Sequence, residues 1–464
     1  MRRSLHSKGL QMKRSQLWSY LGILCLSLGL YFQCTPAMAL GWLEMPQRCN
    51  PHDPKSHAHP GPVLSPTPTT VSCRPQPNLM QLAVSNNEFA LDLFDSLQKS
   101  APAGKNITFS PFSISTALAM VWSGAEGQTA SQMAEVLKFQ EDPSTLASQY
   151  AQLQSDLFQE ASSNGLTVTV ANSLWLNSAD SFSVPYLNLM QQNYSALVTN
   201  LSFGDPVTVV NQVNNWVSQE TDQMIPSILS PSDVNPSSVA FLLNAIYFKG
   251  NWARPFQASA TYPRSFYCED GSLTTTSMMQ QNGNFYYAQN SDAQILELPY
   301  TGNDYSMLLI LPAQNTSLAS IEAKLSPALL NQWIEALCPT SFVQVSLPKL
   351  ALYFGPVDLK SNLLSMGMTD AFSAGTCNLD NMVTSSHNQA FVEFVKHVAT
   401  VDVGENGTTA AAVTAVGVGL AVITTPMPII KYNFNVNHPF LFMIRERSTG
   451  SILFISQVMN PNLQ

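Results

Sequence analysis

Charged residues are scarce in this chain. Lysine, arginine, aspartate and glutamate make up 11% of its 464 residues, against about 25% in an ordinary globular domain. Hydrophobic residues make up 45%, so the chain is expected to bury a large core, and disorder of the whole chain is excluded. The net charge is −9, and no basic run follows residue 39. We therefore expect no nucleic-acid partner and no binding to an anionic membrane.

Common catalytic and metal-binding patterns are also missing. The chain has no HExxH, no GxSxG and no P-loop, which leaves no local signature of a zinc protease, an α/β-hydrolase or a nucleotide-binding enzyme. Its seven cysteines include no CxxC pair and no zinc-type spacing. We therefore expect no enzyme activity, no metal and no cofactor. A secreted hydrolase is the weaker alternative, and it would need a serine, a histidine and an aspartate brought together only by the fold.

The first 39 residues have the pattern of a secretory signal peptide. These residues include five basic side chains, all before residue 15, and no acid. An apolar stretch covers residues 17–32, and Ala37-Met38-Ala39 follows. Sixteen apolar residues are fewer than the roughly 20 of a membrane span, although a short anchor remains the alternative. We predict cleavage after Ala39 and a secreted protein, extracellular or periplasmic. Losing five positive charges would leave a net charge of −14, so activation by a polyanion is not expected.

Residues 40–82 are predicted to form a proline-rich tail or linker. Residues 40–80 contain nine prolines, a composition typical of extended, mobile chain. Export permits disulfides, and Cys49 and Cys73 of this tail could pair. The remaining cysteines, Cys268, Cys338 and Cys377, are far apart in the sequence and are expected to be isolated buried thiols.

Globular sequence follows from residue 83. Helical spacing of apolar residues predicts helices at 86–99, 113–122, 131–137 and within 205–229, the last with Trp216 and Ile225 facing inward. Alternating or continuous apolar runs predict strands at 166–176, 238–248, 294–300, 305–312, 342–348, 388–403, 431–436, 440–446 and 452–458. Helices come first and strands follow without regular βαβ alternation. This order predicts the α+β class, with large antiparallel or mixed sheets.

Residues 406–430 are 25 consecutive residues without a charge, and the first half is made of small and β-branched residues. A transmembrane helix is disfavoured by the threonines, glycines and prolines in the run. A buried strand would be several times longer than the usual five or six residues. A flexible loop would normally be charged or rich in glycine and serine. The fourth interpretation is a segment that changes between loop and strand.

Several motifs, in order along the chain, resemble those of the serpin family. They are FSPFS at 109–113, NAIYFKGNW at 244–252, LPY at 298–300, LPK at 347–349, DAF at 370–372 and NHPF at 437–440. The resemblance runs from about residue 83 to residue 461. It implies one domain over residues 83–464, with three β-sheets, about nine helices and an exposed reactive-centre loop at about 405–430.

The start of the uncharged segment resembles the hinge of this loop in inhibitory serpins. The matching residues are Glu405, Gly407, Thr408, Thr409, Ala410, Ala411, Ala412, Val413 and Thr414. Side chains alternate between the two faces of a strand, and no residue from Gly407 to Thr414 puts a charge or a large group on either face. The resemblance implies suicide inhibition, in which a serine protease forms an acyl-enzyme at the loop and the loop then inserts into the main sheet. A non-inhibitory serpin that acts as a carrier, chaperone or scaffold is the alternative.

The resemblance also implies roles for residues outside the hinge. Ser110, Ser113, Asn244 and His397 match the family's shutter, and Trp252 matches its breach, where the loop enters the sheet. The family's spacing from the hinge glycine places the reactive bond between Ala421 and Val422. The segment that follows is long, so cleavage at Ile423, Thr425 or Met427 stays open. Small apolar residues favour an elastase-like or subtilisin-like protease over a trypsin-like one, bound to a monomeric inhibitor.

Overall fold

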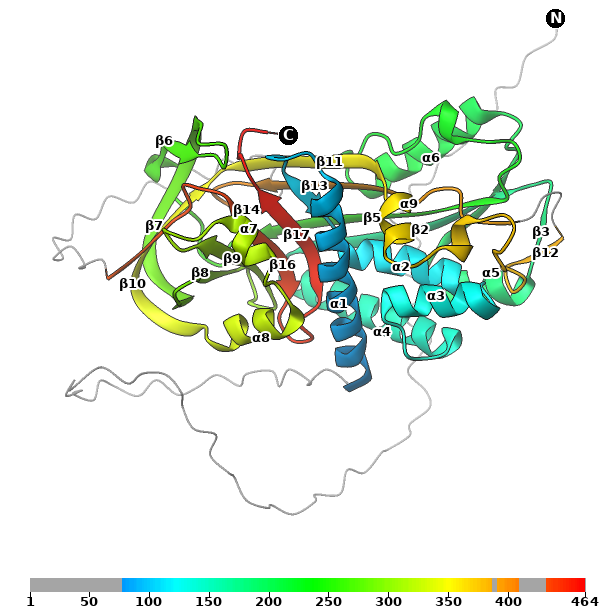
Figure 1. Cartoon of the computed structure of the whole chain (residues 1–464), viewed down its shortest axis with the longest axis horizontal. Coiled ribbons are helices and arrows are strands. Elements are labelled where there is room, and N and C mark those ends of the chain that lie inside the picture. Colours follow the sequence, from blue (N-terminus) through cyan, green and yellow to red (C-terminus); the bar gives the residue numbers. More distant parts are fainter. Residues whose placement is uncertain (1–76, 386–389, 409–430, 464) are drawn as a thin grey trace, which may run out of the picture. The chain divides into compact units, whose positions relative to one another are not determined.

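The computed structural model describes residues 77–385, 390–408 and 431–463. In these ranges the chain forms nine α-helices and three β-sheets, which confirms the predicted α+β class (Figure 1). The helices are α1 (Pro77–Ser100), α2 (Pro111–Trp122), α3 (Gly127–Leu137), α4 (Pro143–Ser163), α5 (Val184–Asn193), α6 (Pro206–Glu220), α7 (Leu318–Glu322), α8 (Pro327–Glu335) and α9 (Lys360–Ser365). Three short 3-10 turns, η2 (Pro231–Asp233), η3 (Ala258–Ala260) and η4 (Asp370–Phe372), complete the helical elements of these ranges.

A six-stranded sheet forms the centre of the fold. Its order is β11-β13-β14-β5-β2-β4. The bounds are β2 (Thr167–Asn177), β4 (Leu197–Leu201), β5 (Ala240–Asn251), β11 (Leu350–Asp358), β13 (Lys396–Val403) and β14 (Gly407–Thr408). The long strands β2 and β5 pair antiparallel over ten residues. Both are almost entirely buried, because helices cover the two faces of this part of the sheet.

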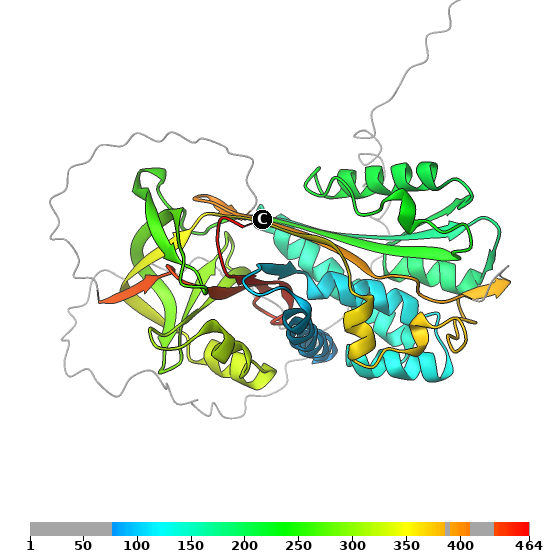
Figure 2. The same ribbon diagram turned by 45° about the horizontal axis from the view of Figure 1, so that its top comes forward.

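Figure 2 shows the helices on the two faces of this sheet. Helix α6 lies on one face, and α2 lies on the other beneath β5. The α6 face encloses a small apolar cluster that includes Phe203, Phe241 and Val398. The α2 face belongs to the main core, which extends into the second sheet. Any strand added to the six-stranded sheet would therefore be buried on both faces.

A nine-stranded sheet forms the second part of the core. Its order is β1-β17-β16-β9-β8-β7-β10-β15, and β6 pairs with β7. The bounds are β1 (Ile107–Phe109), β6 (Thr261–Tyr267), β7 (Leu273–Gln289), β8 (Ala293–Pro299), β9 (Tyr305–Pro312), β10 (Cys338–Pro348), β15 (Tyr432–Asn435), β16 (Phe440–Glu446) and β17 (Ile452–Val458). A third sheet pairs β3 (Ser181–Phe182) with β12 (Val383–Ser385). Strand β15 follows directly on the uncharged segment and lies at the edge of the nine-stranded sheet.

Most predicted elements are present, and three of them differ in extent. Helix α1 begins at Pro77, so the last six residues assigned to the proline-rich tail belong to this helix. The helical prediction over 205–229 is right only for α6, although Ile225 is buried beyond its end. The strand predicted at 388–403 is too long, since β13 starts at Lys396. Residues 390–395 are half-buried and join no ladder, so their apolar pattern alone was misleading.

Two cysteines of the described ranges are free, and one is not. Cys377 is buried and Cys268 is half-buried, both as free thiols. Burial raises the pKa of Cys377 to about 11, which keeps it protonated and unreactive. Cys338 is disulfide-bonded, so the expectation of an isolated thiol is wrong for this residue. The described part of the chain contains no helix with the length and apolar character to cross a membrane. The predicted signal peptide and most of the predicted tail lie outside the described residues.

Candidate insertion site in the six-stranded sheet

The first hinge residues already form a short strand between two longer ones. In β14, Gly407 pairs with Asn251 and Thr408 with Gly250, both of β5, and Thr408 also pairs with Val403 of β13. The sequence predicted this hinge as part of an exposed loop. The structure instead places its first two residues inside the sheet, with Thr408 only 2% exposed. The later hinge residues, 409–414, and the predicted bond between Ala421 and Val422 lie outside the described residues.

A tight turn returns the chain from β13 into β14. The amide of Gly404 donates to the carbonyl oxygen of Gly407 at 2.9 Å. A Cβ atom on Gly407 would lie 1.9 Å from the carbonyl oxygen of Gly250. No side chain fits at that distance, so the hinge requires glycine at this position for the backbones to approach.

Trp252 and Tyr300 contact the turn and the short strand β14 through hydrogen bonds to Gly404 and Thr408. Their rings are stacked, with centroids 4.6 Å apart and an angle of 14° between the planes. The indole Nε1 of Trp252 donates to the carbonyl oxygen of Gly404 at 3.0 Å. The hydroxyl oxygens of Tyr300 and Thr408 lie 2.5 Å apart, which is hydrogen-bond distance. Burial raises the pKa of Tyr300, so its hydroxyl keeps the proton that this bond requires.

Glu405 fixes the turn from outside the sheet. Its carboxylate accepts from Thr261 Oγ1 at 3.1 Å and pairs with Lys349 Nζ at 2.8 Å. Its carbonyl oxygen accepts from the amide of Phe256 at 2.8 Å. Burial by itself would raise the pKa of Glu405, but the bonds from Lys349 and Thr261 outweigh it and hold the pKa below the usual value. The acid of the hinge motif is therefore charged and tied to two neighbouring segments.

The four residues predicted as a shutter lie together beneath the sheet. Ser110 caps helix α2 by accepting from the amide of Ser113 at 3.2 Å, with Pro111 at the first helical position. The amide of Ser110 donates to His397 Nε2 of β13 at 3.1 Å. The hydroxyl of Ser113 donates to Asn244 Oδ1 of β5. One helix end thus holds both strands that border β14, and all four residues are buried.

The hydrogen-bond network continues through a residue that the sequence analysis missed. Asn244 Nδ2 donates to Asn172 Oδ1 of β2, and Asn172 Nδ2 donates to the carbonyl oxygen of Tyr194 at 2.7 Å. Asn172 lies in a predicted strand, and a polar residue amid that apolar alternation was the available signal. Burial lowers the pKa of His397 to about 3, so this histidine is neutral and can accept from Ser110.

Strands β5 and β13 are joined by β14 but not by a ladder of their own. Within the described strands, the pairing of β5 is with β2 and β14, and that of β13 is with β11 and β14. From Gly250 back to the start of β5, and from Val403 back to the start of β13, the facing edges of the two strands therefore carry backbone groups that another strand could pair with.

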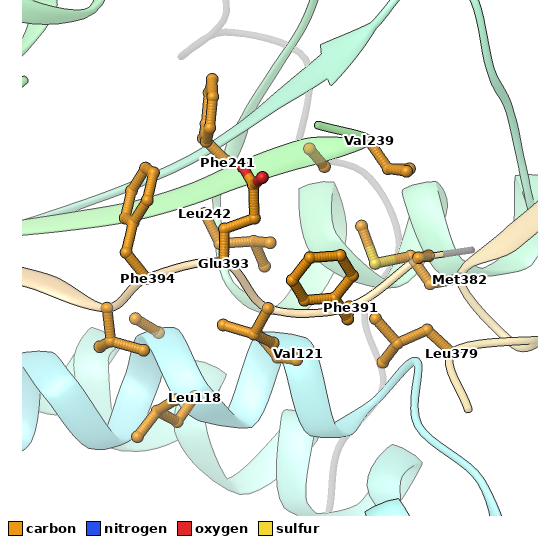
Figure 3. Close-up of a pocket in the computed structure, with 15 residues that line it drawn as sticks. Leu118, Val121, Val239, Phe241, Leu242, Leu379, Met382, Phe391, Glu393 and Phe394 are labelled. Carbon is orange, nitrogen blue, oxygen red and sulfur yellow. The ribbon is translucent and has the colours of Figure 1, made fainter. Parts of the chain in front are cut away.

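An apolar cavity of about 50 Å³ lies where β5 begins and where the chain approaches β13, at the end of these strands opposite β14. Figure 3 shows its lining, with Leu118 and Val121 of α2 facing Leu242 of β5 and Phe391 of the segment before β13. Leu242 and Phe391 are only half-buried in this place. The sheet is thus incompletely packed where a longer β14 would end.

Comparison with known proteins identifies the family. The sequence model described as "Serpin (serine protease inhibitor)" matches residues 84–461. The chain belongs to the serpin family. As a serpin it is similar to the leukocyte elastase inhibitor of Xenopus laevis, with 36% identity over 82% of this chain and 99% of that protein. It is 34% identical to an uncharacterised serpin-like protein of Thermococcus kodakarensis over 91% of this chain and 95% of that one.

Solved serpin structures show the same fold. Native protease nexin-1, crystallised with heparin, superposes with a TM-score of 0.73 at 31% identity, covering 83% of this chain and all of that one. The curated relatives that carry a function in their names are inhibitors, not enzymes. Across the described part of this serpin, no group of three or more histidine, cysteine or acidic side chains is placed to hold a metal ion.

Proposed function

We propose that this serpin is a secreted, monomeric inhibitor that traps a serine protease as a covalent acyl-enzyme. The protease attacks the reactive-centre loop, and the cut loop then extends β14 down the six-stranded sheet before water can release the enzyme. The observation that supports this most directly is β14 itself. Its two residues already pair with β5 on one side and β13 on the other, while those strands share no ladder with each other.

The register of β14 predicts the partners of the remaining hinge. If both ladders continue, each further hinge residue moves one position back along β5 and β13. Six residues beyond Thr408, Thr414 then comes opposite both Asn244 and His397. The small, uncharged hinge would thus meet the two strand residues held by the α2 helix end. This agreement supports insertion in a single, fixed register.

The same register carries the inserted strand to the cavity. On the β5 side, Val416 would come opposite Leu242 and Val418 opposite Ala240, both of which line the cavity. Filling this space with valine side chains removes apolar surface from water and restores packing. An uncharged, β-branched sequence at these positions therefore has a physical role in the inserted form.

Insertion would release enough free energy to distort a protease. Extending β14 adds backbone hydrogen bonds on two edges, and a dozen bonds at ~1 kcal/mol each give on the order of 10 kcal/mol. The thirteen residues from Thr409 to Ala421, at ~3.3 Å per residue, would move an attached enzyme by about 43 Å. Displacement on this scale would disrupt the geometry that deacylation by water requires.

Ala421 as the residue before the reactive bond favours a protease with a small apolar pocket. We propose elastase-like or subtilisin-like targets, with cleavage between Ala421 and Val422. The protein, purified after secretion, would be mixed with elastase or subtilisin and analysed by denaturing electrophoresis and mass spectrometry. The proposal expects a denaturant-stable product at the summed mass and a peptide that starts at Val422. Cleavage without a stable complex would instead identify a non-inhibitory serpin.

A further inference from the structure

Three contacts connect the β5 side of the six-stranded sheet to the β13 side, at the end of these strands opposite β14. The ring of Phe394 stacks on Phe241 of β5, with centroids 5.3 Å apart and 20° between the planes. The hydroxyl of Ser238 donates to the carboxylate of Glu393. The third contact is the ion pair between Asp233 and Lys396, 2.5 Å apart, whose side chains are only 18% and 16% exposed. Each contact joins β5 or the segment before it with the start of β13 or the segment before that strand.

These contacts lie in the path of a complete inserted strand. Along β13, the register of β14 places residue 415 opposite Lys396, where the strand begins. Later residues must therefore pass between the β5 segment around Phe241 and the segment 393–395. A strand inserted there would set its two neighbours about 9.6 Å apart, twice the ~4.8 Å spacing within a sheet. The direct contacts between the two segments would have to break.

We propose that Phe241–Phe394, Ser238–Glu393 and Asp233–Lys396 form a clamp that resists the second half of loop insertion. This inference rests on the proposed function and adds its regulation. Residues up to 415 can enter while the clamp is closed, and residues from 416 onward require it to open. The clamp thus keeps the uncut protein from inserting its own loop, and it sets how fast a cut loop completes its travel.

A matched pair of substitutions separates clamping from ordinary packing. Phe203 also stacks on Phe241, with centroids 4.6 Å apart, but it lies between β4 and α6, outside the segment that leads into β13. Phe394→Leu and Phe203→Leu each remove one ring from the same stack. Asp233→Asn has a similar control in Asp95→Asn, which removes an exposed ion pair with Lys99 on α1.

The test compares stoichiometry and spontaneous inactivation. Each variant is titrated against subtilisin or elastase, and the uncut protein is held at 45 °C while its inhibitory activity and melting temperature are followed. We expect Phe394→Leu and Asp233→Asn to inactivate at least threefold faster than the wild type and to need fewer molecules per trapped protease. Their controls should keep wild-type rates and stoichiometry, even if Phe203→Leu lowers the melting temperature equally. Equal rates in Phe394→Leu and Phe203→Leu would overturn the clamp.

A second readout keeps this test independent of trapping. If the wild type forms no stable complex, the proposed inhibitory function fails, but the clamp is still measurable. The loop is then nicked with subtilisin, and the time taken for the nicked chain to become resistant to 8 M urea is compared between variants. Faster acquisition of resistance in Phe394→Leu and Ser238→Ala than in Phe203→Leu supports the clamp. Identical time courses reject it.

Discussion

The hydroxyl of Tyr300 is within hydrogen-bond distance of the hydroxyl of Thr408, with 2.5 Å between the oxygens. Tyr300 follows β8 of the nine-stranded sheet, and Thr408 lies within the uncharged segment as the last residue described before residue 431. Both side chains are buried. This contact holds Thr408 inside the sheet of the uncut protein, so the loop insertion that we propose would start from a strand that already exists.

Removing the Tyr300 hydroxyl should loosen the hinge selectively. We expect Tyr300→Phe to cost about 1 kcal/mol of stability and to speed hydrogen exchange at the amides of residues 404–408. Tyr305→Phe is the matched control, because the Tyr305 hydroxyl donates to the carbonyl oxygen of Leu157 at 2.7 Å, away from the hinge. Equal exchange at residues 404–408 in the two variants would show that the Tyr300 bond does not retain the hinge.

A charge at Thr408 should abolish trapping while leaving cleavage intact. Thr408→Arg would bury a guanidinium without a partner beside Tyr300, which is costly, so the hinge should leave the sheet and fail to re-enter it. Titration against elastase or subtilisin should show at least a tenfold rise in inhibitor cut per protease trapped. Thr409→Arg would put the charge on the opposite face of an inserted strand, which is also buried, so this variant should impair trapping as well. Wild-type stoichiometry in Thr408→Arg would refute the insertion mechanism.

The buried His397 should make the fold sensitive to acid. Its pKa is lowered to about 3 by burial, against 6.5 in the unfolded chain, so between these values the unfolded chain binds a proton that the folded chain does not. The stability that neutral His397 contributes is complete above pH 6.5 and is lost as the pH falls toward 3, by at most about 1.4 kcal/mol per pH unit. Urea midpoints measured from pH 4 to 7 should fall less steeply in His397→Gln. Parallel curves for the two proteins would contradict this assignment.

The ion pair between Glu405 and Lys349 should contribute modestly. Its side chains are 18% and 45% exposed, so a double-mutant cycle with Glu405→Gln and Lys349→Gln should give a coupling of about 0.2–1 kcal/mol that shrinks in high salt. Because the folded pKa of Glu405 is lowered, its contribution is present above pH 4.5 and is lost as the pH falls below it. The exposed pair Lys99–Asp95 provides the control cycle. A coupling of zero at low salt would show that hydrogen bonds alone hold the turn.

Periodicity predicted the fold class, and local signals placed many elements. The strand predicted at 166–176 corresponds to β2, and that at 305–312 to β9, because both are long and apolar. The prediction at 388–403 failed for its first half, where Phe391 and Phe394 pack against α2 and Phe241 without pairing. A run of apolar residues is compatible with burial against any element, so it cannot distinguish a ladder from a packed, irregular segment.

The candidate site likewise contains residues that local motifs could predict and residues that only the fold brings together. The residues of the hinge, shutter and breach were predicted from motifs, since their types and spacing are local properties of the sequence. Asn172, Lys349 and Tyr300 were not assigned roles, because their partners Asn244, Glu405 and Thr408 lie 56 to 108 positions away. No spacing rule connects residues so far apart in the chain.

The sequence by itself determined that residues 406–430 carry no charge and begin with small and β-branched residues, which a strand buried on both faces would tolerate. Only the tertiary structure decided that Gly407 and Thr408 already lie between β5 and β13, and that Phe394, Glu393 and Lys396 tie the far ends of those strands together. The physical reason is that strand neighbours are chosen by backbone pairing and packing over long separations. Composition records what a segment tolerates, whereas the assembled sheet determines which edges are still open to it.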